Sequence, residues 1–301
     1  MTLPGALAQA LARATGASVT GGAPTSGGSI NEAWAVQLDG GRRAFLKTRA
    51  DAAPGEYATE AAGLRWLAEP GAVVLPRVLA VCDDGDTRFL ALEWIDEGRL
   101  DRDGEEALGR GLAAMHASGA PAFGTPPPGA PSGGHGVAPL RIGELKLPND
   151  PTADWPSFYA RRRLEPLVAL CRRRGTLSAS GADAVERVCE RIGDLAGPPE
   201  PPARLHGDLW GGNVLAGADG RARLIDPAAY GGHREVDLAM LRLFGAPSER
   251  VFAAYAEVAP LADGHADRVA LYQLFPLLVH AALFGGHYGA SAERAARQYT
   301  Q

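Results

Sequence analysis

The segment from His206 to Asn213, which reads HGDLWGGN, constrains this chain more than any other stretch. Thirteen residues after Asn213 comes Asp226, a second carboxylate. A carboxylate, an amide and another carboxylate at this spacing suit transfer of a phosphoryl group from ATP. In that reaction a protein holds Mg²⁺ on the phosphates and accepts the proton of the acceptor hydroxyl. We expect Asp208 to be the proton acceptor, because a short carboxylate on a tight loop can reach a substrate hydroxyl.

Asn213 and Asp226 are the predicted ligands of the metal ion. Asn213 can turn its amide oxygen toward a metal from the same loop as Asp208. Asp226 ends an apolar run predicted as a short strand, so it would be held rigidly as a second hard oxygen ligand. The alternative is a loop in which Asp and Asn only form turns. The His-Gly pair before the loop and the strand after it favour the catalytic interpretation.

The bulk properties of the chain exclude several classes of protein. Its 301 residues suffice for one large or two medium domains, and 46% hydrophobic residues are ordinary for a globular protein. A net charge of −5 argues against a nucleic-acid-binding face, and no apolar run is long enough to span a membrane. The N-terminus lacks the basic start of a secretory signal, and the three cysteines are widely separated. We therefore expect a cytoplasmic protein with neither nucleic-acid nor membrane partners.

The first third of the chain predicts a small lobe rich in β-structure. A Gly-rich turn precedes a strand, the hairpin signal Asp39-Gly40-Gly41 follows, and a returning strand carries Lys47. A helical pattern comes next and carries Glu60. The predicted helices cover residues 5–15 and 56–68, and the predicted strands cover residues 34–38, 44–48, 78–82 and 89–94.

Beyond residue 100 the pattern is mostly helical. Residues 118–136 are rich in Pro and Gly and predict a long irregular loop. The arginine runs at 161–163 and 172–174 are expected on solvated helix faces. Helices are predicted at 105–117, 154–174, 182–195 and 268–284, with two more after Asp237. We expect an α+β, two-lobed, protein-kinase-like fold, in which residues 1–95 form the nucleotide-binding lobe and residues 96–301 form the larger, mainly helical catalytic and substrate lobe.

Three further features complete the predicted ATP site. Gly28 and Ser29 could direct backbone N–H groups at phosphate oxygens, although a plain turn fits equally well. Lys47 is one of only two lysines in an arginine-rich chain, which suggests that a compact ammonium is needed there rather than a solvent-exposed charge. Glu60 could pair with Lys47, or it could lie on a solvated helix face. The order of these parts before Asp208 is that of protein kinases.

Two aromatic residues and one carboxylate are further candidates for a role at or near the site. Trp210 follows Asp208 by two residues, so its ring could contact the substrate; the alternative is that it packs the loop onto the lobe. His280 lies in an apolar helix, where a lone histidine is most often a satisfied core residue. Asp237 is expected to cap its helix and to support the catalytic loop.

These motifs resemble the fructosamine kinase (ketosamine-3-kinase) family, a branch of the protein-kinase-like small-molecule kinases. The resemblance rests on HGDLWGGN, on Asp226-Pro227-Ala228 and on the run YGGHREVDLA at 230–239, and it extends over nearly the whole chain. The tryptophan in HGDLWGGN distinguishes this family from aminoglycoside phosphotransferases and choline kinases.

The resemblance implies ATP-dependent phosphorylation of the 3-hydroxyl of a ketoamine, a sugar–amine adduct, and hence removal of sugar from amines or proteins. By motif, Asp208 would be the base and Asn213 and Asp226 the Mg²⁺ ligands. Lys47 with Glu60 would anchor phosphate.

The resemblance also implies roles for residues outside the catalytic loop. Glu93, Trp94 and Ile95 would form the hinge that meets adenine, and His280 would form a wall of the substrate pocket. Ser29 stands where some members carry a cysteine linked to redox-dependent dimerisation, so no such switch is expected. The expected partner is a small ketoamine or a glycated protein, and the expected state is a monomer or weak homodimer.

Two rival functions remain open. One is another small-molecule kinase on the same fold, of the aminoglycoside or choline kinase type. The other is a catalytically silent ATP-binding module.

Overall fold

The computed structural model describes residues 3–25, 31–83, 87–132, 136–245 and 247–300. The N-terminal part is a five-stranded antiparallel sheet in the order β1-β2-β3-β5-β4, with a helix on each face. A 3₁₀ turn, η1 (Asp39–Gly41), joins β2 to β3 at the predicted hairpin. The elements of this part are α1 (Gly5–Thr15), β1 (Val19–Thr25), β2 (Glu32–Leu38), β3 (Arg43–Thr48), α2 (Glu56–Ala68), β4 (Val78–Cys82) and β5 (Phe89–Glu93).

Strand β5 explains how both faces of the sheet are covered. Successive side chains of a strand point to opposite faces, so a strand buried on both sides is apolar at every position. Ala91 packs in one cluster with Leu11 of α1, and Leu90 packs in another with Leu64 of α2. The sheet is therefore a middle layer between the two helices.

The C-terminal part is mainly helical, with short two-stranded ladders between the helices. In sequence order it contains α3 (Arg102–Ala117), β6 (Leu140–Ile142), β7 (Leu145–Leu147), α4 (Trp155–Phe158), the π-helix η2 (Tyr159–Leu164), α5 (Glu165–Arg174), α6 (Ala179–Glu190), α7 (Ile192–Leu195), β8 (Ala203–Leu205), η3 (Gly211–Asn213), β9 (Val214–Ala216), β10 (Ala222–Leu224), β11 (Tyr230–Gly232), α8 (Glu235–Leu243), α9 (Glu249–Val258), α10 (His265–Phe284) and α11 (Tyr288–Arg297).

Helix α10 lies in the largest hydrophobic core, where Tyr272 and Phe275 are fully buried. The same core contains a buried cation. The Arg163 guanidinium lies 4.6 Å from the ring centre of Phe158 and 4.2 Å from that of Tyr230. It is fully buried, so the predicted solvated face is wrong for this arginine. The π-helical turn at 159–164 lies within the predicted helix and carries Arg163.

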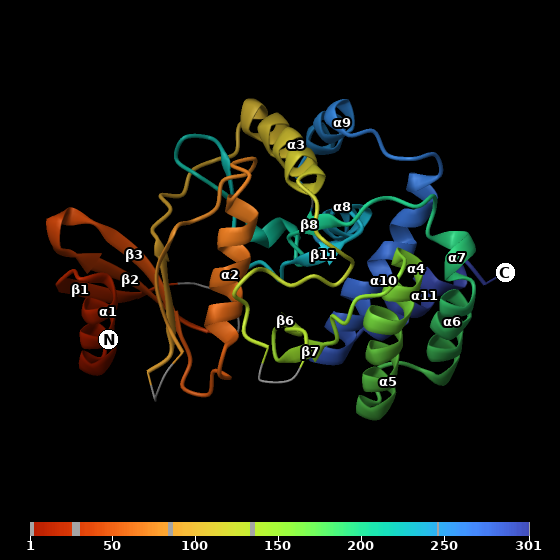
Figure 1. Ribbon diagram of the computed structural model, residues 1–301, viewed down its shortest axis with the longest axis horizontal. Helices are drawn as coiled ribbons and strands as arrows, with labels where there is room; N and C mark the ends of the chain where they lie inside the picture. Colours follow the sequence, from red (N-terminus) through yellow and green to blue (C-terminus); the bar gives the residue numbers. More distant parts are fainter. Residues whose placement is uncertain (1–2, 26–30, 84–86, 133–135, 246, 301) are drawn as a thin grey trace.

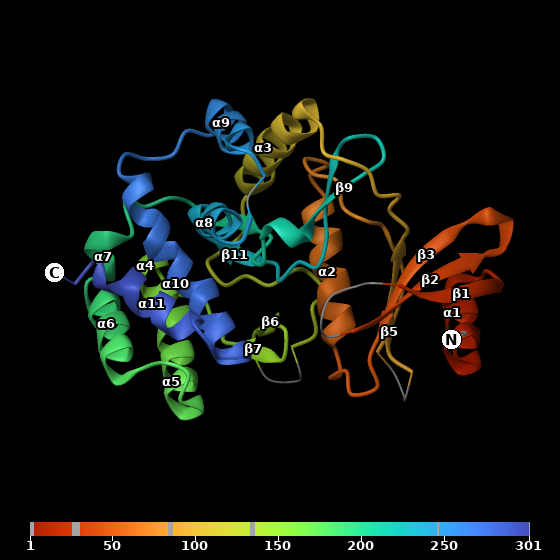
Figure 2. The same cartoon turned by 180° about the vertical axis from the view of Figure 1, so that it is seen from behind.

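Helix α2 is packed directly on the C-terminal lobe. In both views it stands between the sheet and the helical lobe (Figure 1, Figure 2). A Cβ added to Gly63 would lie 3.3 Å from the Ala229 side chain. At the end of the helix, Arg204 donates to the Trp66 carbonyl at 3.0 Å and pairs with Glu69 at 2.6 Å. The helix that carries Glu60 is thereby fixed relative to the segment that follows Asp226.

The prediction of helices 5–15 and 56–68 is confirmed, and the predicted helix 182–195 is divided into α6 and α7. Strand β1 was not predicted, because its sequence VTGGAPT has two glycines and a proline, which are poor strand formers. As an edge strand, β1 tolerates them. The short hairpin β6–β7 was not predicted either.

The two-lobed α+β architecture predicted from the sequence is confirmed. Strand β5 ends at Glu93, and Glu97 already bridges to Gly217 of the C-terminal part. These two observations support our proposal that the lobes divide between residues 95 and 96. Within the described residues, no helix has both the length and the apolar character needed to cross a membrane.

Candidate active site

Lys47 contacts one carboxylate from each lobe. Its Nζ lies 2.6 Å from Glu60 Oε1 on α2 and donates to Asp226 Oδ1 at 2.9 Å. The Lys47 side chain is 4% exposed, whereas Asp226 is 41% exposed, so the ammonium is reached through the Asp226 side. Burial alone lowers the pKa of Lys47, but the Glu60 and Asp226 carboxylates together raise it above its usual value. The lysine therefore keeps its charge.

Asp226 has an unusual backbone conformation. It follows β10 by two residues and has a φ of 54°, in the left-handed region that non-glycine residues seldom adopt. His206 supports this turn, because its Nε2 lies 3.0 Å from the Ile225 carbonyl oxygen and so carries the proton that it donates. The Ile225 N–H donates to the carbonyl of Asn213. Strain of this kind is characteristic of functional sites.

The loop between β8 and β9 holds Asp208 and Asn213 together. Asn213 Nδ2 donates to the backbone oxygen of Asp208 at 2.8 Å and to its Oδ2 at 3.1 Å. The amide nitrogen is thus turned to Asp208, which leaves the amide oxygen pointing elsewhere. Gly207 has a φ of 80°, and a Cβ there would lie 1.9 Å from the Ala228 carbonyl oxygen. Only glycine fits that position.

Asp237 holds this loop in place through its backbone. Its carboxylate is fully buried and accepts hydrogen bonds from the backbone N–H groups of His206 at 2.7 Å and Gly207 at 2.9 Å. His116 of α3 contacts the same carboxylate through Nε2 at 3.2 Å, and its Nδ1 contacts the Tyr255 hydroxyl at 2.9 Å. The expected support of the loop by Asp237 is borne out by these bonds.

The expected helix cap at Asp237 is wrong. Helix α8 begins at Glu235, so Asp237 lies in its first turn and its oxygens are used by the catalytic loop instead. His116 was not predicted at all. It lies in a helical segment whose apolar pattern gives no sign of a buried polar contact with α8.

The environment of Asp208 suits a group that gains a proton. Burial raises the pKa of Asp208, the Asn213 hydrogen bond lowers it, and the Asp226 and Asp237 carboxylates raise it; together they bring it to about 7. A carboxylate with a raised pKa is a stronger base than an ordinary one.

A cavity of about 350 Å³ lies between the lobes and ends at Asp226. Its walls are largely apolar, and they come from both lobes: Thr25, Phe45 and Leu92 from the sheet, Gly212, Leu215 and Ile225 from the catalytic side. The predicted hinge residues Glu93, Trp94 and Ile95 line it as well. The apolar residues of this wall were not predicted, since isolated hydrophobic residues on strands carry no distinguishing signal.

The structure places the remaining predicted residues as follows. Gly28 and Ser29 lie outside the described residues. The Trp210 ring packs over Gly212, where an added Cβ would lie 2.2 Å from it, yet Trp210 is 40% exposed. His280 lies on α10 among aromatic side chains, and its Nδ1 is 2.8 Å from the Pro276 carbonyl oxygen.

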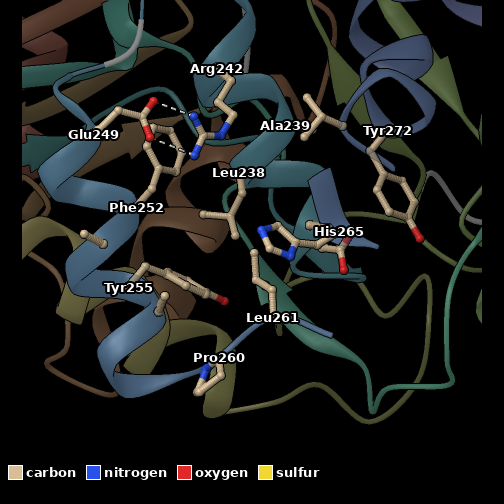
Figure 3. A pocket seen from close by; sticks show the side chains of 14 residues that line it. Leu238, Ala239, Arg242, Glu249, Phe252, Tyr255, Pro260, Leu261, His265 and Tyr272 are labelled. Atoms are coloured by element: carbon tan, nitrogen blue, oxygen red, sulfur yellow. Dashed lines mark hydrogen bonds and ion pairs between the residues drawn. The ribbon is translucent and has the colours of Figure 1, made fainter. Parts of the chain in front are cut away.

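A second cavity, of about 460 Å³, lies between α8, α9 and α10 and contains none of the predicted residues. Figure 3 shows its lining, with Arg242 paired to Glu249 at one end. Although it is larger than the cleft between the lobes, we assign the chemistry to the cleft, because Asp226, which contacts Lys47, lines the cleft.

One group of side chains has the spacing of a metal site. Glu200, His233 and Glu235 bring ligand atoms within 4.8 Å of one another. However, Arg234 donates twice to Glu200 at 2.7 Å, and Arg268 donates to both oxygens of Glu235. Both carboxylates are therefore already neutralised, and the group is structural.

This fold, with a buried lysine held between two carboxylates across an interlobe cleft, defines a protein-kinase-like phosphotransferase that acts on an alcohol group. Structures with the same fold include a macrolide 2′-phosphotransferase from Brachybacterium faecium, with a TM-score of 0.59 and 18% identity over 97% of each chain.

The sequence profile of the fructosamine kinase family matches residues 5–301. The chain belongs to this family, as the sequence motifs predicted. A crystal structure described as a fructosamine-3-kinase from Thermobifida fusca superimposes with a TM-score of 0.87 and 42% identity, over 97% of this chain and 98% of that one. A probable ketoamine kinase of Thermus thermophilus is 36% identical over 93% of this chain and 95% of its own length. A probable ketoamine kinase of Escherichia coli K12 is 32% identical over 89% of this chain and 88% of its own length.

Proposed function

We propose that this protein transfers the γ-phosphoryl group of ATP to the 3-hydroxyl of ketosamines, the fructosamine and ribulosamine adducts. One observation carries the proposal: the Lys47 ammonium contacts Glu60 and Asp226 at the end of an interlobe cleft, beside the loop that holds Asp208 and Asn213. The family membership and the names of its relatives support a ketoamine as the acceptor.

The nucleotide would occupy the cleft with adenine against its apolar walls. The backbone N–H of Glu93 already donates to the Arg77 carbonyl. Ile95, in contrast, makes no backbone hydrogen bond within the described part of the chain. Its N–H and carbonyl are therefore free to meet the edge of the base. Lys47 would hold the phosphates, and Glu60 would keep its ammonium directed at them. Gly28 and Ser29 are proposed to cover the phosphates.

The residues present fit Mg²⁺. Asn213 and Asp226 offer an amide oxygen and a carboxylate, the hard oxygen ligands that this ion prefers. The amide oxygen of Asn213 is not used by Asp208, and the Asp226 carboxylate is partly exposed toward the cleft. When bound, Mg²⁺ would neutralise phosphate charge during transfer.

Asp208 is proposed as the general base that accepts the proton of the 3-hydroxyl as that oxygen bonds to the γ-phosphorus and the bond from this phosphorus to ADP breaks. The two hydrogen bonds from Asn213 fix the loop and one carboxylate oxygen, which leaves the other for the substrate. Trp210, with its partly exposed ring, is proposed to contact the sugar, and His280 to contact the rest of the ketoamine. The phosphorylated adduct is unstable and separates into amine, inorganic phosphate and a sugar-derived product, so the reaction would remove sugar from amines or proteins.

The test is release of ADP with a panel of acceptors. We expect turnover with fructose-lysine or ribulose-lysine and none with aminoglycosides or choline. Turnover only with the latter compounds would establish the rival small-molecule kinase. Binding of ATP without turnover on any acceptor would establish a silent module. We further propose a cytoplasmic monomer or weak homodimer, which light scattering of the purified protein tests for its oligomeric state.

A further inference from the structure

Four aromatic side chains form a cluster near the C-terminal end of α10. The ring of His280 lies 4.6 Å from that of Phe244, 5.0 Å from that of Tyr288 and 5.6 Å from that of Phe284, measured between ring centres. Phe284 is 57% exposed, so the cluster is open to solvent on one side. These rings come from three segments of the chain, which follow α8, end α10 and begin α11.

The cluster adjoins the catalytic loop. A Cβ added to Gly211 would lie 2.0 Å from the Gly245 carbonyl oxygen and 3.1 Å from that of Phe244. The segment that carries Phe244 is therefore in backbone contact with the loop, three residues after Asp208. A substrate held with its hydroxyl at Asp208 could extend from the loop onto these rings.

The hydrogen bonding of His280 fixes its tautomer. Nδ1 lies 2.8 Å from the Pro276 carbonyl oxygen, which can only accept, so Nδ1 must carry the proton. Nε2 therefore presents a lone pair, and within the described residues it has no hydrogen-bond partner. Burial, opposed by the Pro276 hydrogen bond, lowers the pKa of His280 and keeps the ring neutral near pH 7.

The cationic side chain of Arg174, which contacts α10 beside the cluster, is already compensated. Arg174 donates to the Ala282 carbonyl of α10 at 2.6 Å and pairs with Glu144 at 2.9 Å. The cluster itself thus consists of a neutral hydrogen-bond acceptor surrounded by aromatic faces. Such a group stabilises a cation that carries N–H donors.

We propose that this cluster, defined by Phe244, His280, Phe284 and Tyr288, is the subsite for the protonated amine of the ketoamine substrate. His280 Nε2 accepts a hydrogen bond from the ammonium, and the aromatic faces stabilise its positive charge. The inference rests on the proposed function and adds a criterion of specificity: the enzyme selects the basic nitrogen, and not only the sugar, of its substrate.

The test compares a fructosamine with its ether analogue, in which oxygen replaces the amine nitrogen. We would measure the dissociation constant of each compound by calorimetry without ATP, and kcat and KM with ATP. The wild-type protein should bind the amine about tenfold to a hundredfold more tightly than the ether, the scale of one charge-assisted hydrogen bond with cation–π contacts. His280→Phe should reduce this ratio about tenfold through the affinity for the amine, while the affinity for the ether changes less.

Two further variants serve as a control and as a second test of the cluster. His265→Phe is the matched control, because His265 begins the same helix, is exposed and also directs Nδ1 at a carbonyl oxygen, that of Ala262. It should leave the ratio unchanged. Phe284→Leu changes a ring that is 57% exposed, and it should weaken amine binding more than ether binding.

The possible results separate the two proposals. Equal affinity of the wild-type protein for amine and ether, or an equal effect of His280→Phe on both, would overturn the amine subsite even if phosphorylation occurs. Selective binding of the amine without any phosphorylation would support the subsite and overturn the proposed function.

Discussion

At the scale of single residues, the site depends on where a few charges are placed. Lys47 is buried and charged, and it is stable in that state because Glu60 and Asp226 approach it from two lobes. A buried charge is costly unless it is paired, so these three residues form one unit. The unit exists only in the folded arrangement of both lobes.

Asp208 carries the most direct prediction at this scale. Asp208→Asn should lower kcat by about 10²–10⁴, the usual effect of losing a general base, because the amide cannot accept the hydroxyl proton. ATP affinity should stay nearly unchanged, since Asp208 does not contact Lys47. Steady-state ADP release and nucleotide titration measure the two quantities. An unchanged kcat would remove Asp208 from the proposed role.

Asp226 permits a separation of stability from activity. Asp226→Gly removes the carboxylate but suits a φ of 54°, and Glu60 still pairs with Lys47 at 2.6 Å. The free energy of unfolding should therefore fall by less than the ~3–5 kcal/mol that loss of a buried ion pair costs. Mg²⁺-dependent turnover should be lost. The matched control is Asp219→Gly in an exposed turn, which should leave turnover intact. Persistence of full activity in Asp226→Gly at ordinary Mg²⁺ concentrations would contradict the ligand assignment.

Sequence reasoning succeeded at this scale where the order of residue types was distinctive. A lysine retained in an arginine-rich chain was predicted to pair with a glutamate on the next helix, and Lys47 does contact Glu60. The second contact of Lys47, with Asp226, was not predicted. The contact between His116 and Asp237 was missed, because it joins two helices 121 positions apart and depends on tertiary packing alone.

At the scale of elements, helix α8 carries the catalytic loop. Asp237, in its first turn, accepts hydrogen bonds from two backbone N–H groups of that loop, and both groups are buried. A buried donor left without a partner costs about 1–3 kcal/mol. The rigidity of the loop thus comes from a helix that follows it in the sequence.

Asp237→Ala should therefore lower the free energy of unfolding by about 2–6 kcal/mol, since two buried donors lose their acceptor. Asp237→Asn keeps one acceptor oxygen and should cost less. Urea unfolding of both variants measures the order. If Asp237→Ala were as stable as wild type, the carboxylate would not be the anchor of the loop.

The stacked ring of His233 predicts a dependence of stability on pH. His233 is buried against Trp155 and Tyr272, and burial lowers its pKa to about 4 from an unfolded value of 6.5. The unfolded state then binds more protons, so this contribution is complete above pH 6.5 and is lost as the pH falls toward 4. Between pH 7.5 and pH 5 it amounts to about 2 kcal/mol.

Urea unfolding at the two pH values, with His233→Gln as the comparison, measures this contribution. The variant should lose less stability on acidification than the wild type. An equal loss in both proteins would mean that His233 is not kept neutral by the fold.

Elements with continuous periodicity were predictable, and short irregular ones were not. The bounds of α1 and α2 agree with the sequence prediction. Strand β1 and the three-residue strands β6 to β9 and β11 were missed, because such segments are too short to show a period, and their pairing is decided by partners far along the chain.

At the scale of the whole molecule, α2 acts as the bridge between the lobes. It packs on the sheet through Leu64 and on the segment after Asp226 through Gly63. Close packing at Gly63 therefore sets the distance between Glu60 and Asp226, and with it the position of Lys47.

Gly63→Val tests this bridge. A larger side chain must displace Ala229, 3.3 Å from the site of the new Cβ, and should lower kcat/KM for ATP about tenfold to a hundredfold by misplacing Glu60. Gly193→Val in α7, where nothing lies within 4 Å of the added carbon, is the control. Equal values for both variants would show that the packing of α2 does not position the site.

The central claim is that the γ-phosphoryl group of ATP is transferred in the cleft to the 3-hydroxyl of a ketoamine. The most direct measurement is NMR of the product formed from fructose-lysine, Mg²⁺ and ATP, which identifies the carbon that bears phosphate. We predict phosphate on the oxygen of carbon 3, formed by the wild-type protein and nearly absent with Asp208→Asn. Phosphate on another hydroxyl, or the same yield with Asp208→Asn, would contradict the account.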